Sequence, residues 1–200
     1  MRMTRHASRR TPRPVRRTQI RTGADFLRWE PLLCEPQRTR LAAVPAPVAV
    51  LGRRLPASLD ALSFEALSRL WAVRTSAELL TVGAEVVLGL SSRAVLTQAP
   101  ALQVIGFCNW LMRELERVNA LWAEIRSTRT SEEVMAGVDD LAFGAFGLAD
   151  WYARRMGMHN HDEAFATPWP RVWQCLRMDT AESEYRKRLQ KIINDKTRRK

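Results

Sequence analysis

The chain has 200 residues, of which 46% are hydrophobic, and a formal net charge of +11. This length allows one domain with a substantial core, or one domain plus an arm. The longest apolar run, residues 41–51, is interrupted by Pro45 and Pro47 and falls short of the roughly 20 residues of a membrane span. The three cysteines are widely spaced, which fits reduced thiols better than a disulfide framework or a zinc site. We therefore expect a soluble, cytoplasmic protein that makes no membrane contact.

The positive charge is concentrated at the two ends of the chain. Residues 1–58 carry thirteen arginines against three acids, a balance of +10, and residues 186–200 carry eight basic residues against one acid, a balance of +7. Residues 59–185 consequently have a balance of −6. The high isoelectric point therefore describes the ends, whereas the middle of the chain is acidic.

The first part of the chain is predicted to be an arm. Residues 1–22 contain eight arginines and no acid, and such a segment buries too little apolar surface to offset the entropy of ordering. We expect residues 1–57 to form a basic, Arg/Pro-rich flexible arm and a Pro-rich linker. The arm either contacts phosphate groups or is a solvated tail or a misassigned start. In the first case the candidate phosphate contacts are Arg9, Arg10, Arg13, Arg16 and Arg17.

Residues 58–197 are predicted to form an all-α domain, a compact multi-helix bundle with halves at 58–127 and 130–197. Apolar residues at helical spacing predict a first helix over 59–73. A capping-box pair, Thr75 and Glu78, predicts a second helix that ends at Gly89. A short helical turn opened by Ser91 is expected to stop before Pro100, because a residue that precedes proline disfavours the helical conformation.

The longest helix is predicted to follow Pro100. Apolar residues alternate steps of four and three from Val104 to Ile125, which is the spacing of a coiled-coil seam. Additional apolar residues widen that face, so the pattern favours a helix of a bundle over a coiled-coil strand.

Residues 130–193 are predicted to form short amphipathic helices joined by capped turns. Thr130 and Glu133 have capping-box spacing, and an apolar stripe continues from there to Tyr152. The glycines inside that stripe indicate either close helix packing or a break near Gly144. Gly157 is expected to end this helix with a left-handed residue.

Two further helices are expected near the C-terminus. Asn160 and Glu163 predict a second capping box, and Pro168 suits the first turn of the next helix. The apolar residues of the last helix lie at i, i+4, i+7 and i+8, namely Tyr185, Leu189, Ile192 and Ile193. Its basic C-terminal residues match the negative end of the helix dipole.

The sequence contains no convincing catalytic constellation. The first lysine is Lys187, so a P-loop is absent, and residues 89–93 lack the last glycine of a nucleophile elbow. The cluster His159, His161, Asp162 and Glu163 lacks the i, i+4 histidine spacing of a zinc helix, and its acids suit a helix N-terminus. We therefore expect no catalytic residue, cofactor or metal, with metal or acid–base use of this cluster as the alternative.

Several segments resemble the small helical tail assembly chaperones of long-tailed bacteriophages and prophages. The segments that carry the resemblance are AGVDDLAFGAF at 136–146, Asp162–Glu163 and EYRKRLQKI at 184–192. Residues 62–125 agree more weakly through a Gly89–Leu90–Ser91 turn and a following long helix, and residues 1–57 match nothing in that family. The resemblance implies a non-enzymatic protein that binds and solubilises the tape-measure protein during tail morphogenesis in the bacterial host cytoplasm.

Partner contacts are predicted from helical phase and aromatic character, independently of the family. Trp169 and Trp173 share a helix face, which is typical of a core or a protein interface, and aromatic anchors dominate many interfaces. The expected partner is the tape-measure protein or another long helical tail protein, and a homo-oligomer is compatible with the pattern. The alternative is a nucleic-acid-associated helical phage or virion protein that uses its basic arm and C-terminus. The candidate partner-binding residues are Phe143, Phe146, Trp151, Trp169 and Trp173.

Overall fold

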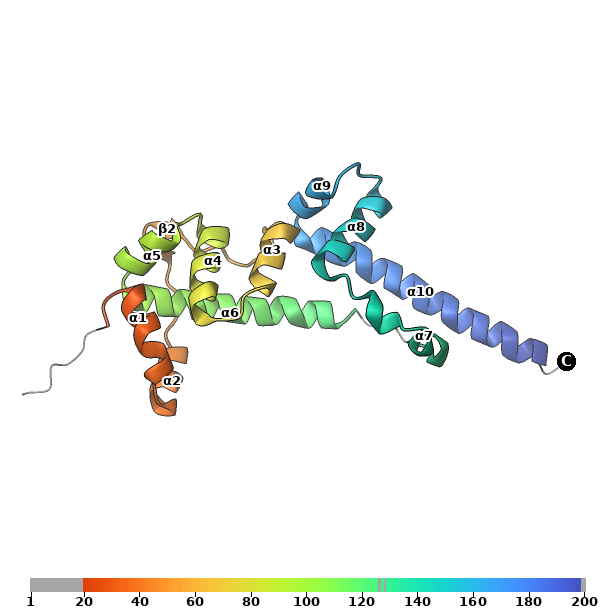
Figure 1. Ribbon diagram of the computed structural model, residues 1–200, viewed down its shortest axis with the longest axis horizontal. Helices are drawn as coiled ribbons and strands as arrows, with labels where there is room; N and C mark the ends of the chain where they lie inside the picture. The colour runs from red at the N-terminus through yellow and green to blue at the C-terminus, as the bar shows by residue number, and fades with distance from the viewer. Residues whose placement is uncertain (1–19, 126, 128, 199–200) are drawn as a thin grey trace, which may run out of the picture.

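The computed structural model describes residues 20–125, 127 and 129–198 (Figure 1). Over these residues the fold is all-α, as predicted, with one short β-hairpin as the exception. The elements in chain order are α1 (Gly23–Trp29), η1 (Glu30–Leu32), α2 (Glu35–Ala42), β1 (Ala49–Val50), β2 (Arg53–Arg54), α3 (Phe64–Trp71), α4 (Ser76–Leu88), α5 (Ser92–Gln98), α6 (Ala101–Ala123), α7 (Ser131–Met135), η2 (Val138–Leu141), α8 (Gly144–Met156), α9 (His161–Ala166) and α10 (Trp169–Arg198).

The segment from residue 20 to residue 57 belongs to the folded body, so the prediction that it is arm and linker is wrong. A capping box starts α1, in which the Asp25 amide donates to Thr22 Oγ1 at 3.3 Å and the Thr22 amide donates to Asp25 Oδ2 at 3.1 Å. Phe26 on α1 and Val50 in the hairpin are buried in the core. The segment is ordered because α1 packs against α5 and α6, and α2 and β1 pack against α6.

The chain between α2 and the hairpin lies directly against α6. Gly106 permits this approach, because a Cβ atom there would lie 2.2 Å from the carbonyl oxygen of Pro45. One turn later, Asn109 Nδ2 donates to the carbonyl oxygens of Leu41 at 2.8 Å and Val44 at 3.1 Å. These bonds attach the end of α2 and the loop after it to α6.

The N-terminal half is built around α6, which spans most of its length in Figure 1. Val104, Phe107 and Leu111 are fully buried, which agrees with the prediction of a bundle helix. Gly83 lets α4 approach closely, since a Cβ atom there would lie 2.3 Å from Leu111 Cδ2. The N-cap at Thr75 and the left-handed Gly89 that ends α4 are both as predicted.

The first predicted helix begins later than expected. Ser63 is the N-cap of α3 and accepts a hydrogen bond from the amide of Ala66 at 3.1 Å. Leu59 and Leu62 therefore precede the helix, and Leu59 is still fully buried. The spacing of Leu59 and Leu62 predicted a helix because it matches that of a buried helical face. Both side chains do pack on the core, but they do so from a loop, so the spacing indicated burial and not helical structure.

The C-terminal half begins with the predicted capping box at Thr130 and Glu133, which starts α7. The apolar stripe that follows is not one continuous helix, because Gly137 and Gly144 have φ angles of 79° and 58°. Of the two interpretations of these glycines, close helix packing or a break near Gly144, the structure shows the break. Gly157 ends α8 in the left-handed conformation, as expected.

The last helix begins directly after Pro168, as predicted, but it is longer than α6, so the prediction that the helix after Pro100 is the longest is wrong. α10 has 30 residues and so spans about 45 Å. Its start is fixed to the N-terminal half by two backbone hydrogen bonds, from Phe64 N to Thr167 O at 2.8 Å and from Trp169 N to Leu62 O at 3.0 Å. Its distal part extends away from the body beside α7 (Figure 1).

Candidate partner-binding surface

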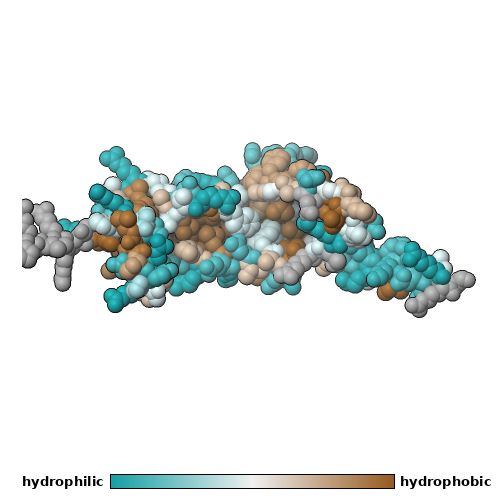
Figure 2. Space-filling view, turned by 60° about the horizontal axis from the view of Figure 1, so that its bottom comes forward, coloured by the Kyte–Doolittle hydropathy of each residue, from teal (hydrophilic) through white to brown (hydrophobic). Residues whose placement is uncertain are grey.

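Three large apolar side chains that are close in sequence are exposed between the end of η2 and the first turn of α8. Leu141, Phe143 and Phe146 are 62%, 68% and 58% exposed, and we call them the aromatic patch. Gly147 allows Phe143 to fold back over the first turn of α8, because a Cβ atom at Gly147 would lie 2.6 Å from the Phe143 Cβ. Figure 2 shows hydrophobic residues gathered over the part of the molecule that contains α8 and α9.

The patch is supported from below by aromatic contacts that reach the core. The ring of Phe146 lies 4.8 Å from the ring of His161 and 6.4 Å from that of Phe165, measured between centroids. Phe165 in turn stacks on the buried Phe64 at 5.9 Å. The exposed ring of Phe146 is thus held by a rigid support, which lowers the entropic cost of using it in a contact.

A charged group borders the patch on the same face of α8. Asp150 lies one turn after Phe146 and accepts hydrogen bonds from His161 Nε2 at 3.1 Å and from Arg154. The hydrogen bond from His161 is the main reason why the pKa of Asp150 is lowered. This network joins α8 to α9 and fixes the orientation of His161 beneath the patch.

The predicted tryptophans do not lie with the two phenylalanines on this surface. Trp151 is half-buried beside Tyr152. Trp173 is half-buried as well, with its Nε1 donating to the carbonyl oxygen of Leu121 at 3.0 Å and Arg177 stacked over its ring at 5.3 Å.

Trp169 requires a correction, because the fold removes it from any surface. It is 1% exposed, and its Nε1 donates to the carbonyl oxygen of Leu59 at 2.9 Å. Its position on a shared helix face with Trp173 was compatible with a core or an interface, and the packing of α10 on the N-terminal half decides for the core.

The other predicted contacts fall outside this surface. Arg9, Arg10, Arg13, Arg16 and Arg17 lie outside the described residues. The histidine and acid cluster does form the start of α9, where Asn160 caps the helix by accepting from the amide of Glu163 at 2.9 Å. Among the described residues, no three His, Cys, Asp or Glu side chains are grouped so that they could hold a metal ion.

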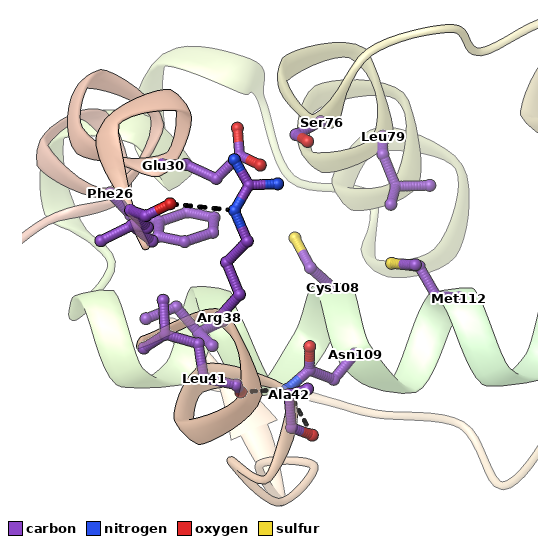
Figure 3. Close-up of a pocket in the computed structure, with 12 residues that line it drawn as sticks. Phe26, Glu30, Arg38, Leu41, Ala42, Ser76, Leu79, Cys108, Asn109 and Met112 are labelled. Carbon is purple, nitrogen blue, oxygen red and sulfur yellow. Dashed lines mark hydrogen bonds between the residues drawn. The ribbon is translucent and has the colours of Figure 1, made fainter. Parts of the chain in front are cut away.

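A separate pocket lies between the N-terminal helices and the α4–α6 pair (Figure 3). Its volume is about 230 Å³ and its walls include Phe26, Leu79 and Cys108. Arg38 reaches along one side, with its Nε donating to the carbonyl oxygen of Leu33 at 3.1 Å. Sequence reasoning missed this pocket because it assigned the segment that forms one wall to a flexible linker.

The Cys108 side chain has a packing role in this pocket. Burial raises the pKa of the Cys108 thiol to about 12, and the nearby charge of Glu30 adds to the effect. A thiol with this pKa is protonated at neutral pH and is a poor nucleophile.

No protein-family model matches the chain, and neither a curated protein nor a solved structure proved similar to it. Within the part of the chain that the structure describes, no single helix combines the length and apolar character needed to cross a membrane. One bent pair, α4 and α5, passes that test only when its two helices are taken together across an angle of 113°.

Proposed function

We propose that this chain is a phage tail assembly chaperone whose C-terminal half binds amphipathic segments of the tape-measure protein and keeps them soluble. The observation that carries the proposal is the aromatic patch of Leu141, Phe143 and Phe146, which is exposed to solvent and supported by the core. A further support is the resemblance of residues 136–146, which include all three of these side chains, to that family.

The physical basis is the recognition of a helix by an apolar surface. An amphipathic helix presents apolar residues at i, i+3, i+4 and i+7, and such residues gain free energy when they are buried against a partner. Phe143 and Phe146 offer large rings at low entropic cost. When the partner helix binds, its apolar face and the two rings cover each other. Neither apolar surface is then exposed to solvent, where it could aggregate.

The test is co-expression with the tape-measure protein encoded in the same genome. The double variant Phe143→Ser/Phe146→Ser is expected to weaken binding by about tenfold or more, because hot-spot aromatics cost about 2 kcal/mol or more when truncated. The control is Leu102→Ser on α6, since Leu102 is 68% exposed and lies in the other half of the chain. Equal loss of soluble tape-measure protein with both variants, or no binding by the unaltered chain, would contradict the proposal.

A nucleic-acid-associated role is the second candidate. The observation that favours it is the distal part of α10, where Arg188, Lys191, Lys196 and Arg198 are all exposed. Binding through phosphate contacts would weaken steeply with salt concentration. A truncation that removes residues 1–19 tests the arm cleanly, whereas removal of residues 1–40 would also delete α1 and its buried Phe26.

Salt titration of binding to a DNA or RNA duplex separates the two candidates. A steep salt slope that the 1–19 truncation reduces would favour the nucleic-acid role. A chain that binds the tape-measure protein equally well with and without residues 1–19 would favour the chaperone.

A further inference from the structure

The distal part of α10 carries an apolar stripe that the described residues leave exposed. Tyr185, Leu189 and Ile192 are 57%, 41% and 53% exposed, and we call these three residues the α10 stripe. Their steps of four and three are those of a coiled-coil seam. Figure 2 shows a hydrophobic area on the otherwise hydrophilic end of the molecule where α10 terminates.

The stripe faces away from the rest of the chain. At 100° per residue its three members lie within about 60° of one another, and Lys187 projects from the opposite side of the helix. Lys187 Nζ pairs with Glu133 Oε1 of α7 at 3.2 Å, so α7 lies on that opposite side. The helix therefore buries one face against its own domain at Lys187 and presents the α10 stripe outward.

Charged residues flank the stripe in a pattern that selects one orientation of a partner helix. Arg188 and Asp195 lie seven residues apart on the same flank. Neither is part of an ion pair within residues 20–125, 127 and 129–198. In a parallel pair of two α10 helices, Arg188 would face Ile193 of the second copy, and the two Lys196 side chains would meet in one layer of the seam.

An antiparallel pair separates the two Lys196 side chains and gives Arg188 an acidic partner, while Ile193 then faces Arg186 of the second copy. When Leu189 of one copy lies opposite Ile192 of the other, the coiled-coil register places Arg188 opposite Asp195 of the second copy. The twofold axis repeats each of these contacts. In the same register Tyr185 lies opposite Lys196, whose aliphatic stem can cover the ring while its ammonium group stays in water.

We propose that the α10 stripe binds the same stripe of a second copy of this chain, as an antiparallel helix pair in which Leu189 packs on Ile192 and Arg188 pairs with Asp195. The overlap runs over residues 183–198, a length of about 24 Å. This is small for a protein interface, so the dimer is a weak one that forms at roughly micromolar concentrations. The aromatic patch lies on α8 and takes no part in this contact, so the self-association and the chaperone function can fail independently.

The first experiment is sedimentation velocity of the full chain over a concentration series. The unaltered chain is expected to shift from monomer to dimer as its concentration rises. Leu189→Glu/Ile192→Glu places charges in the seam and is expected to stay monomeric throughout. Arg171→Glu is the control, because it lies on α10 outside the overlap and is exposed. Circular dichroism checks that each variant keeps its helical content, which the exposure of these side chains leads us to expect.

The second experiment tests the orientation by exchanging charges. Arg188→Glu and Asp195→Arg, made singly, each place like charges opposite one another twice and are expected to weaken the dimer by about tenfold or more. The double variant Arg188→Glu/Asp195→Arg restores opposite charges only in the antiparallel register, so its affinity should return close to that of the unaltered chain.

Three results would overturn the proposal. The first is an unaltered chain that stays monomeric at every concentration. The second is a dimer that survives Leu189→Glu/Ile192→Glu, which would place the interface elsewhere. The third is a double charge variant that remains as weak as the single variants, which would exclude the antiparallel register.

Discussion

Two tryptophans one turn apart on α10 connect the two halves of the molecule. Trp169 Nε1 donates to the carbonyl oxygen of Leu59, and Trp173 Nε1 donates to that of Leu121. Both acceptors belong to the N-terminal half, and each also accepts a backbone hydrogen bond, from the amide of Leu62 and from that of Glu124. The indoles therefore act as cross-links as well as apolar filling.

Replacing Trp169 by phenylalanine is expected to destabilise the chain by about 1 to 3 kcal/mol. The variant keeps an aromatic ring but removes the hydrogen bond from Nε1 to the carbonyl oxygen of Leu59, which keeps only the bond from the Leu62 amide. The cost combines the lost buried hydrogen bond with the cavity that the smaller ring leaves. Trp173→Phe is the graded comparison, because this side chain is only partly buried and water can replace its donor. Urea unfolding measures both variants, and an equal loss of stability in the two would contradict the assignment of Trp169 to the core.

Cys108 is expected to resist alkylation at neutral pH. Burial raises the pKa of its thiol from an ordinary value of 9.0 to about 12, which lowers the thiolate fraction roughly a thousandfold. Cys34 is exposed and serves as the internal comparison in the same chain. Mass spectrometry after iodoacetamide treatment should find Cys34 modified first, and the two sites should become equally reactive once the chain is unfolded in urea.

At the scale of single elements, signals that act within one turn were predictable from the sequence. The capping box at Thr130 and Glu133, the N-cap at Thr75 and the left-handed residues Gly89 and Gly157 all depend on neighbours three or four residues away. Two of the five predicted partner residues, Phe143 and Phe146, are exposed, and both lie at the start of α8, before its first buried residue, Ala149.

Features that depend on distant contacts were missed. The apolar side chains of residues 20–57 show no long helical periodicity, and the segment is held in place by Asn109, Gly106 and other positions on α6. The burial of Trp169 likewise depends on Leu59, which is 110 residues away in the chain. Periodicity reports which residues share a face, but the partner of that face is set by the tertiary fold.

The attachment of α7 to α10 is expected to weaken at acidic pH. The pKa of Glu133 is lowered below its ordinary 4.5, first by the hydrogen bond from the Thr130 amide and then by Lys187. A lowered pKa in the folded state means that the stabilising contribution is complete above 4.5 and is lost as the pH falls through the folded-state value.

Glu133→Gln removes this pH dependence. The variant should melt at a slightly lower temperature than the unaltered chain at neutral pH, and the difference should close as the pH falls below 4.5. Thermal melting followed by circular dichroism measures the difference, with Glu124→Gln at the exposed end of α6 as a control. A difference that persists unchanged into acid would show that the charge of Glu133 is not what holds α7.

At the scale of the whole molecule, the two halves differ in how much of their apolar surface they cover. The N-terminal half surrounds α6 and buries most of its large aliphatic residues, whereas the C-terminal half exposes the aromatic patch and the α10 stripe. Both exposed surfaces lie on elements whose other faces are fixed, by Phe165 beneath α8 and by Glu133 beside α10. The chain thus combines a folded support with two separate exposed apolar surfaces, on which the proposed tape-measure contact and the proposed dimer respectively depend.

The extent of the folded body leads to a prediction about truncation. If the body began near residue 58, removal of residues 1–57 would leave a stable domain. The structure predicts the opposite, because that deletion removes Phe26 and Val50 from the core and exposes the surface of α6 around Gly106. Each buried side chain of this size contributes about 1.5 to 3 kcal/mol, and typical domains are stable by only 5 to 15 kcal/mol.

The 1–57 deletion should therefore lose cooperative urea unfolding, whereas removal of residues 1–19 leaves every described contact in place and is the matched control. Phe26→Ala in the full chain should cost about 3 to 5 kcal/mol, and it separates the loss of one core side chain from the loss of the whole segment. A 1–57 deletion that unfolds cooperatively at the midpoint of the full chain would show that this segment, although it packs on α6, adds nothing to the stability of the fold.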